Sequence, residues 1–412
     1  MIYLVWGGQS VSVLLSGATS ISLSLWVYHL TGSAVSLATV AAVRLSISIY
    51  LSPVAGALAD VVRRKTLILI ANVGQAASAL VLMMLTASSP DGASVISLTC
   101  VVLGASGVLD SVLIASLAAS VRDIRSERNL NRASAIVSAL DTCPQVIAPF
   151  LGAILYETWG MTPVLFVDAL SFVVAGCAVA VVRWPDDRRS RASQGSGRSW
   201  SPFRGAAAGL RMIWSHRDYR RLQAGNAVTN LANGLAQTAV SVLLITGADG
   251  VGHALGLYNS SAALGLLIGS LIVAVIGARL RRSWSIGGGM VLAGIGGRAA
   301  LGLTSLAPVW VVSGFVRSIG LQLNNIALTA IWQEATPRAD QGKVFGARRL
   351  LGQGGYPVAV LVGGAVVDII GRGGLGAWLI VLGCLETAVA AVLAASGVLG
   401  RIGGVATPAL VE

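Results

Sequence analysis

Apolar residues run along this chain in blocks of about 20, each long enough to cross roughly 30 Å of hydrocarbon as a helix. Short polar breaks with turn residues separate the blocks, such as Ser-Ser-Pro-Asp-Gly at 88–92 and Thr-Gly-Ala-Asp-Gly at 246–250. The pattern predicts twelve membrane-spanning helices. Their expected ranges are 4–29, 36–59, 66–87, 94–118, 134–156, 163–182, 222–246, 254–278, 285–305, 309–331, 350–370 and 375–399.

Composition agrees with this pattern. Of the 412 residues, 55% are hydrophobic and only 11% are charged, and the mean hydropathy is +0.78. Soluble domains carry about 25% charged residues. These values exclude a cytosolic enzyme, a secreted domain and a disordered chain, and they predict an all-α membrane protein that crosses the bilayer many times.

The distribution of cations predicts the orientation. The net charge is +12, which in a soluble chain would suggest a nucleic-acid partner. With both termini in the cytoplasm, however, 25 of the 29 Lys and Arg residues fall in inner loops or the C-terminal segment. This is the positive-inside rule. We therefore expect no nucleic-acid partner, a multi-pass protein of the inner (plasma) membrane, and cytoplasmic N- and C-termini.

The longest polar stretch lies at the midpoint of the chain. Residues 185–197 are rich in Arg, Asp, Ser and Gly and predict a flexible linker. Residues 203–221 place Leu210, Ile213 and Trp214 among arginines, which favours an amphipathic helix on the inner membrane surface. The expected organisation is a six-helix bundle at 1–182, a cytoplasmic linker with its helix at 183–221, and a second six-helix bundle at 222–412.

The two halves resemble each other. An offset of 217 aligns residues in the first helix of each half: Gly8 with Gly225, Gln9 with Asn226, Val11 with Val228, Ser12 with Thr229, Leu14 with Leu231 and Gly17 with Gly234. An offset of 213 aligns Arg125 with Arg338, Glu127 with Asp340 and Pro144 with Pro357. Two six-helix repeats joined by an inner loop are typical of a secondary transporter that rocks its halves about a central site.

The loop after the second expected helix carries a motif. Gly56-Ala-Leu-Ala-Asp60-Val-Val-Arg63-Arg64-Lys65 resembles the loop 2–3 signature of the major facilitator superfamily. Val61 and Arg63 depart from it. The resemblance implies that Gly56, Asp60, Arg64 and Lys65 form a gating latch, that helices 1, 4, 7 and 10 line a central cavity, and that the protein is a transporter and not an enzyme. No cofactor or metal is expected.

A second motif narrows the resemblance. Residues 148–153 are similar to the Gly-Pro-x-x-Gly-Gly element of proton-coupled exporters, with Pro149 and Gly152 matching. Segments 130–135 and 342–349 look like loops of the macrolide-efflux and siderophore-exporter branch. This implies a proton-coupled exporter of a small amphiphilic compound, such as an antibiotic, drug or secondary metabolite. Simple helix packing is the alternative explanation of the Pro and Gly residues.

Ionisable side chains inside a span cost about 2.5–3.5 kcal/mol and usually face a cavity or a partner. The resemblance favours Asp110 and Arg317, with Asp110 the first candidate for the proton carrier and Asp141 the second. A fixed structural ion pair or a hydrogen bond that packs helices is the alternative for Asp110. Arg44 is a further candidate for proton coupling; alternatively, its side chain extends to the membrane–water interface. Arg298 and Glu386 lie on helices that are peripheral in the family, so the resemblance implies structural or interfacial roles for them.

Three stripes of polar residues at helical spacing predict a water-accessible central path through the protein. They comprise Gln9, Ser12 and Ser16 in the first helix, Asn226, Asn230, Asn233 and Gln237 in the seventh, and Gln322 and Asn325 in the tenth. Hydrogen bonding between helices is the alternative.

The functions left open are proton-coupled uptake by symport and, far behind, an intramembrane transferase. The expected partners are a small-molecule substrate, protons and the lipid bilayer, with the chain acting as a monomer.

Overall fold

The computed structural model describes residues 2–87, 92–123, 147–182, 202–247, 253–277, 280–336 and 341–402. Asp141 and the segment 130–135 lie outside the described residues. Within the described ranges the regular structure is helical. The chain divides into two compact units, one of residues 1–31 and 43–202 and the other of residues 32–42 and 203–412.

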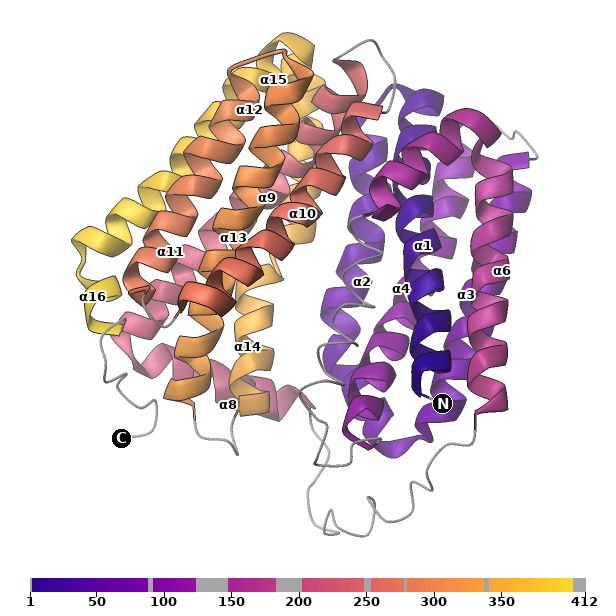
Figure 1. The fold of residues 1–412 in the computed structure, drawn as a ribbon, viewed down its shortest axis with the longest axis horizontal. Coiled ribbons are helices and arrows are strands. Elements are labelled where there is room, and N and C mark those ends of the chain that lie inside the picture. Colours follow the sequence, from indigo (N-terminus) through magenta and orange to yellow (C-terminus); the bar gives the residue numbers. More distant parts are fainter. Residues whose placement is uncertain are drawn as a thin grey trace. The chain divides into compact units, whose positions relative to one another are not determined.

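The N-terminal unit is a bundle of long helices (Figure 1). They are α1 (Ile2–Thr31), α2 (Ala34–Val61), α3 (Arg64–Ala87), α4 (Gly92–Asp123), the helical segment 147–159 and α6 (Met161–Val181). The first turns of α2, up to Ala42, belong to the C-terminal unit. Within the N-terminal unit, α3 packs against both α4 and α6, and α6 also packs against α1.

The C-terminal unit has the same character. Its elements are α8 (Pro202–Ser215), α9 (Arg217–Thr246), α10 (His253–Ile276), α11 (Arg282–Val291), the π-helix η4 (Leu292–Ala299), α12 (Ala300–Gly302), α13 (Ala307–Ala335), α14 (Gln341–Gln353), α15 (Tyr356–Ala395) and α16 (Val398–Ile402). Helix α15 contains Gly371 at a φ of 60°, a left-handed conformation suited to glycine. This bend divides α15 between the expected spans 350–370 and 375–399.

Every expected span overlaps helix in the described residues. Eight helices there are long and apolar enough to cross a membrane, judged by length and composition. The count of twelve therefore stays a prediction. The surfaces of these helices are apolar: Val181, Val275 and Ile369 are 78%, 80% and 83% exposed. Lipid is the solvent that accommodates such side chains.

The internal repeat is visible in the way the helices cross. In the N-terminal unit, a Cβ on Gly152 would overlap the carbonyl oxygen of Ala18 in α1. In the C-terminal unit, a Cβ on Gly363 would overlap the carbonyl oxygen of Leu235 in α9. Ala18 and Leu235 are 217 residues apart, which is the offset found in the sequence.

A second pair of contacts gives the offset between the two partner helices, the segment 147–159 in one unit and α15 in the other. Added Cβ atoms on Gly17 and Gly234 would lie 2.7 and 2.8 Å from the Cβ atoms of Ala148 and Ala359. Ala148 and Ala359 differ by 211, as do Gly152 and Gly363. At residues 148 and 152 the offset is therefore 211 and not 213, because close backbone contact sets the register there. Pro144, which the offset of 213 aligned with Pro357, lies outside the described residues.

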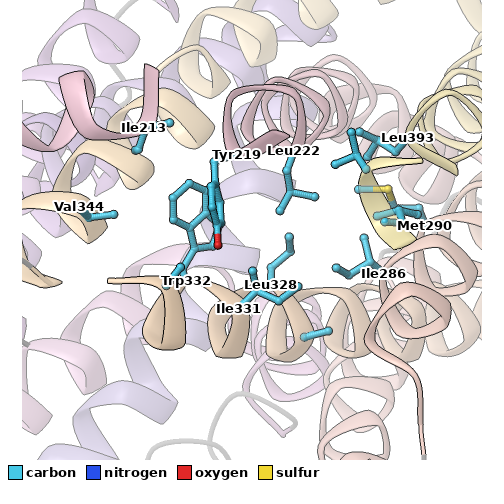
Figure 2. Close-up of a cluster of buried hydrophobic side chains, with 14 of the residues drawn as sticks. Ile213, Tyr219, Leu222, Ile286, Met290, Leu328, Ile331, Trp332, Val344 and Leu393 are labelled. Atoms are coloured by element: carbon cyan, nitrogen blue, oxygen red, sulfur yellow. The ribbon is translucent and has the colours of Figure 1, made fainter. Parts of the chain in front are cut away.

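The expected surface helix is present as α8 and ends at Ser215, and α9 begins at Arg217. The charged residues 217–221 are thus part of a long helix, and the stretch 183–221 is not wholly linker. Ile213 is fully buried, whereas Leu210 and Trp214 are 39% and 53% exposed. Figure 2 shows Ile213 beside Tyr219 and Trp332, members of a buried cluster that packs α8 against the other helices of the C-terminal unit.

The beginning of α2 is capped by a carboxylate from α15. Asp368 accepts hydrogen bonds from the Ser33 hydroxyl at 3.0 Å and from the backbone N–H groups of Ala34 and Val35 at 2.9 and 3.2 Å. An anion at a helix N-terminus satisfies N–H groups that have no partner inside the helix. Asp368 thereby ties the first turn of α2 to the C-terminal unit.

Candidate transport site

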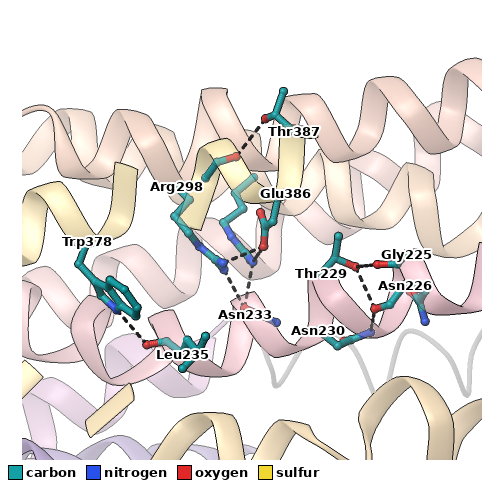
Figure 3. A network of polar contacts seen from close by, with 12 residues as sticks. Gly225, Asn226, Thr229, Asn230, Asn233, Leu235, Arg298, Trp378, Glu386 and Thr387 are labelled. Atoms are coloured by element: carbon teal, nitrogen blue, oxygen red, sulfur yellow. Dashed lines mark hydrogen bonds and ion pairs between the residues drawn. The ribbon is translucent and has the colours of Figure 1, made fainter. Parts of the chain in front are cut away.

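Four side chains of the C-terminal unit form one polar network, which we call the arginine centre: Asn233, Arg298, Arg317 and Glu386. Arg298 donates to Glu386 Oε1 at 2.7 Å and to Asn233 Oδ1 at 2.9 Å. Arg317 donates to the same Asn233 oxygen at 2.9 Å and lies 3.8 Å from Glu386 Oε1. Figure 3 shows Arg298, Glu386 and Asn233 converging from separate helices.

The arginine centre is buried and not electrically balanced. The side chains of Arg298 and Glu386 are 2% and 3% exposed, and that of Arg317 is 12% exposed. Two guanidinium groups face one carboxylate, so one positive charge is in excess. Arg298 Nε and Glu386 Oε2 are buried without a hydrogen-bond partner among the described residues.

Local sequence explains how two arginines fit here. Arg298 lies in η4, a π-helix of eight residues, and π-helical geometry inside an α-helix is rare but frequent at functional sites. The neighbouring Gly297 leaves room for Arg317, because a Cβ there would lie 2.8 Å from Arg317 Cγ. Glycine thus permits the close packing of η4 against α13.

Sequence reasoning divided these residues between two roles. Arg317 and Asn233 were expected at the cavity, and structural or interfacial roles were expected for Arg298 and Glu386. The structure places all four in one network, with Arg298 bonded to both Glu386 and Asn233. The contacts join helices far apart in the chain, so no sequence spacing could reveal them.

The amide stripe of α9 continues from Asn233 along the helix. Asn226 and Asn230 are half-buried, and Gln237 is exposed. Asn230 donates to the Asn226 carbonyl oxygen at 2.8 Å (Figure 3). The amides therefore form a partly accessible polar face that includes one member of the arginine centre.

The stripe of α13 behaves differently along its length. Gln322 donates to the Ser270 hydroxyl of α10 at 2.8 Å, which is a hydrogen bond between helices. Asn325 is exposed.

In the N-terminal unit the α1 stripe faces neighbouring helices. Gln9 and Ser12 are 3% and 2% exposed. Gln9 lies 3.4 Å from Asn72 of α3, and Ser12 lies 3.4 Å from Ser171 of α6. These contacts match the alternative of hydrogen bonding between helices.

Asp168 is the site residue that sequence reasoning missed. It lies within the expected span 163–182, is 5% exposed, and accepts a hydrogen bond from Ser16 at 2.9 Å. Arg44, the other ionisable candidate of this unit, is half-buried in α2. A carboxylate inside an apolar block was the available signal, the same one that singled out Asp110.

Asp110 is half-buried in α4 and has no ion-pair partner among the described residues. Its surroundings thus differ from those of Asp168. No group of three or more potential metal-binding side chains occurs in the described part of the chain.

The two motifs have structural contacts. Lys65, at the start of α3, donates from Nζ to the carbonyl oxygens of Ala180 and Val182 at 2.8 and 2.9 Å, where α6 ends. Arg64 is half-buried beside it, and Gly56 and Asp60 lie in the last turns of α2.

In the exporter-like element, Pro149 is half-buried in the segment 147–159. Its neighbour Gly152 accepts a hydrogen bond from Ser22 through its carbonyl oxygen at 2.9 Å.

Comparison with known proteins agrees with this architecture. The profile of the Major Facilitator Superfamily matches residues 5–247, more than half of the chain. Macrolide efflux protein A of Streptococcus pyogenes is 21% identical over 401 residues, covering 95% of this chain and 94% of that protein.

Solved transporters share the fold. A crystal structure of the nucleoside transporter NupG has a TM-score of 0.72 at 13% identity, covering 95% of this chain and 98% of that one. A POT family transporter in complex with 5-aminolevulinic acid has a TM-score of 0.71 at 13% identity, covering 95% of each chain. The chain belongs to the major facilitator superfamily and is a membrane transporter, not an enzyme.

Proposed function

We propose that this transporter exports a small amphiphilic compound by alternating access and is driven by protons. The observation that supports export most directly is the similarity to macrolide efflux protein A along nearly the whole length of both chains. The exporter-like element at Pro149 and Gly152 points the same way. A proton moving inward releases about 2.3 kcal/mol per 100 mV, a force that export can use.

Asp110 is the proposed proton carrier. It lies half-buried within an apolar helix and has no ion-pair partner among the described residues. An ionisable side chain within a span is costly and usually faces a cavity or a partner, which is the position that a proton carrier requires. Asp168 is the second candidate, because it is more deeply buried and Ser16 bonds to it. Asp141 remains a third.

The loop 2–3 motif is the proposed latch at the inner face. Lys65 bonds to the end of α6, which holds the start of α3 in place. A charged cluster of this kind, with Asp60 and Arg64, can favour one state of a bistable device and release it in the other.

Transport by inside-out membrane vesicles tests the proposal. Vesicles with wild-type protein are energised to an acidic interior and given three fluorescent amphiphiles: one cationic, one neutral and one anionic. We expect accumulation of at least one probe, its loss on adding a protonophore, and its loss in Asp110→Asn. Asp218→Asn is the matched control, since Asp218 pairs with Arg401 away from the apolar helix centres.

Each outcome has a distinct meaning. Protonophore-sensitive accumulation that survives Asp110→Asn but not Asp168→Asn moves the carrier to Asp168. Accumulation only in right-side-out vesicles would replace export with uptake by symport. Accumulation that ignores the protonophore would contradict proton coupling.

The assembly and orientation are proposals too. We propose a monomer in the plasma membrane with both termini in the cytoplasm, as the distribution of Lys and Arg favours. Single cysteines added at each terminus should react with a membrane-impermeant maleimide in inside-out vesicles and not in intact cells. Sedimentation of the purified protein in detergent should give the mass of one chain.

A further inference from the structure

The arginine centre holds one positive charge more than its surroundings balance. Arg298 and Arg317 face Glu386 as the only carboxylate of the network among the described residues, and all three are nearly buried. A buried charge without a counter-charge is costly, and the cost falls when an opposite charge enters. An anion is the ligand that this imbalance favours.

The hydrogen bonds show where such an anion would bind. Both guanidinium groups direct an N–H to the same neutral oxygen, Asn233 Oδ1, at 2.9 Å each. Arginine pairs with a carboxylate frequently through two parallel hydrogen bonds, which adds energy and geometric specificity that a single neutral amide oxygen does not offer. Arg298 Nε is a further donor, buried and without a partner among the described residues. The centre thus has donor capacity that its own residues leave unused.

The members of the centre differ in accessibility. Arg298 is 2% exposed and is held by Glu386, whereas Arg317 is 12% exposed. Asn233 is half-buried and belongs to the α9 stripe, in which Gln237 is exposed. Arg317 is therefore the guanidinium that a ligand can reach past Asn233, and Arg298 is a positioning residue behind it.

We infer that the arginine centre binds a carboxylate of the transported compound, with Arg317 as its direct contact. This inference rests on the proposed function and narrows its substrate class to amphiphiles that carry an anionic head. The apolar body of such a compound would lie along the half-exposed face of α9, and its carboxylate would take the place of the Asn233 amide oxygen.

A matched pair of ligands tests this. The full chain in lipid nanodiscs is titrated calorimetrically with 4-(1-naphthyl)butanoate and with the corresponding amide, and the signal of empty nanodiscs is subtracted. In the wild type we expect the acid to bind about tenfold more tightly than the amide. In Arg317→Gln this preference should disappear, and in Arg317→Lys part of it should remain.

Two further variants protect the test against misfolding and nonspecific charge effects. Asn233→Asp is isosteric and supplies an internal carboxylate next to both arginines, so it should abolish the preference while the protein stays folded. Arg282→Gln removes a cation of the same unit that pairs with Glu334 in an exposed position. It should keep the full preference.

The opposing results are equally definite. Equal binding of acid and amide by the wild type, or a preference that survives both Arg317→Gln and Asn233→Asp, would overturn the inference. If chloride instead of gluconate raises the thermal midpoint in an Arg317-dependent way while acid and amide bind equally, the centre holds a free inorganic anion and not cargo. None of these readouts needs a proton gradient, so failure here is distinct from failure of proton-coupled export.

Discussion

Replacing Glu386 with glutamine should be among the most destabilising conservative changes in this protein. The substitution keeps the shape of the side chain but raises the excess charge of the arginine centre from one to two. Arg298 then loses a charged acceptor at 2.7 Å, and Arg317 loses the carboxylate 3.8 Å away. Removing one partner of a buried ion pair costs about 3–5 kcal/mol, and we expect Glu386→Gln to fall in that range.

The opposite substitution should be milder. Arg298→Gln removes the excess charge, because Arg317 then faces Glu386 alone. The variant still loses the bonds to Glu386 and Asn233, at a cost of about 1–3 kcal/mol for unsatisfied buried groups. Burial alone would predict equal effects, since the two side chains are 2% and 3% exposed. The expected inequality is a direct consequence of the charge imbalance.

Unfolding in mixed detergent micelles measures both effects. The free energy of unfolding is obtained from the sodium dodecyl sulfate dependence of circular dichroism for the wild type, each single variant and the double variant. Arg282→Gln serves as the control, because its ion pair with Glu334 is exposed and should be worth less than about 1 kcal/mol. The double variant should lose less than the sum of the single changes. If Arg298→Gln is as damaging as Glu386→Gln, or more so, the charge-balance argument is refuted.

Three further changes probe helix contacts elsewhere in the two units. Gly152→Val should cost about 1–3 kcal/mol in the same micelle assay because its side chain meets the α1 backbone, whereas Gly373→Ala, which has open space, should be neutral; equal losses would contradict the close crossing. Lys65→Met should cost about 1–3 kcal/mol through its two lost carbonyl contacts, and the exposed Arg63→Met should change little. Asp368→Ala should speed hydrogen exchange in the first turn of α2 by removing its cap, worth about 0.5–2 kcal/mol; unchanged exchange would show that the cap is dispensable.

Much of the fold could be predicted from the sequence because the bilayer restricts a spanning chain to very few backbone structures. Long apolar blocks must be helical in lipid, where backbone groups have no water to bond with, and the described helices lie on the expected blocks. Helix ends were less accurate. α9 begins at Arg217 because Tyr219 and Leu222 pack into the cluster around Trp332. That contact comes from the tertiary structure and overrides the local charge pattern.

The candidate site was only partly predictable. The amides of α9 were recognised by their spacing, since helical periodicity puts them on one face. The partnership of Arg298 with Glu386 was not, because 88 residues separate them. Asp168 was missed although its position within an apolar block was a sufficient signal.

The sequence by itself determined that this protein is helical, spans a membrane and is built from two related halves. The length of the apolar blocks requires helices in lipid, and the residues aligned at an offset of 217 reveal the repeat. The tertiary structure decided which polar groups meet. It brought two arginines to one glutamate and one asparagine, and it turned Gln9 and Ser12 toward neighbouring helices. Contacts of this kind depend on how helices cross, and glycine contacts such as Gly152 against Ala18 and Gly297 against Arg317 set those crossings.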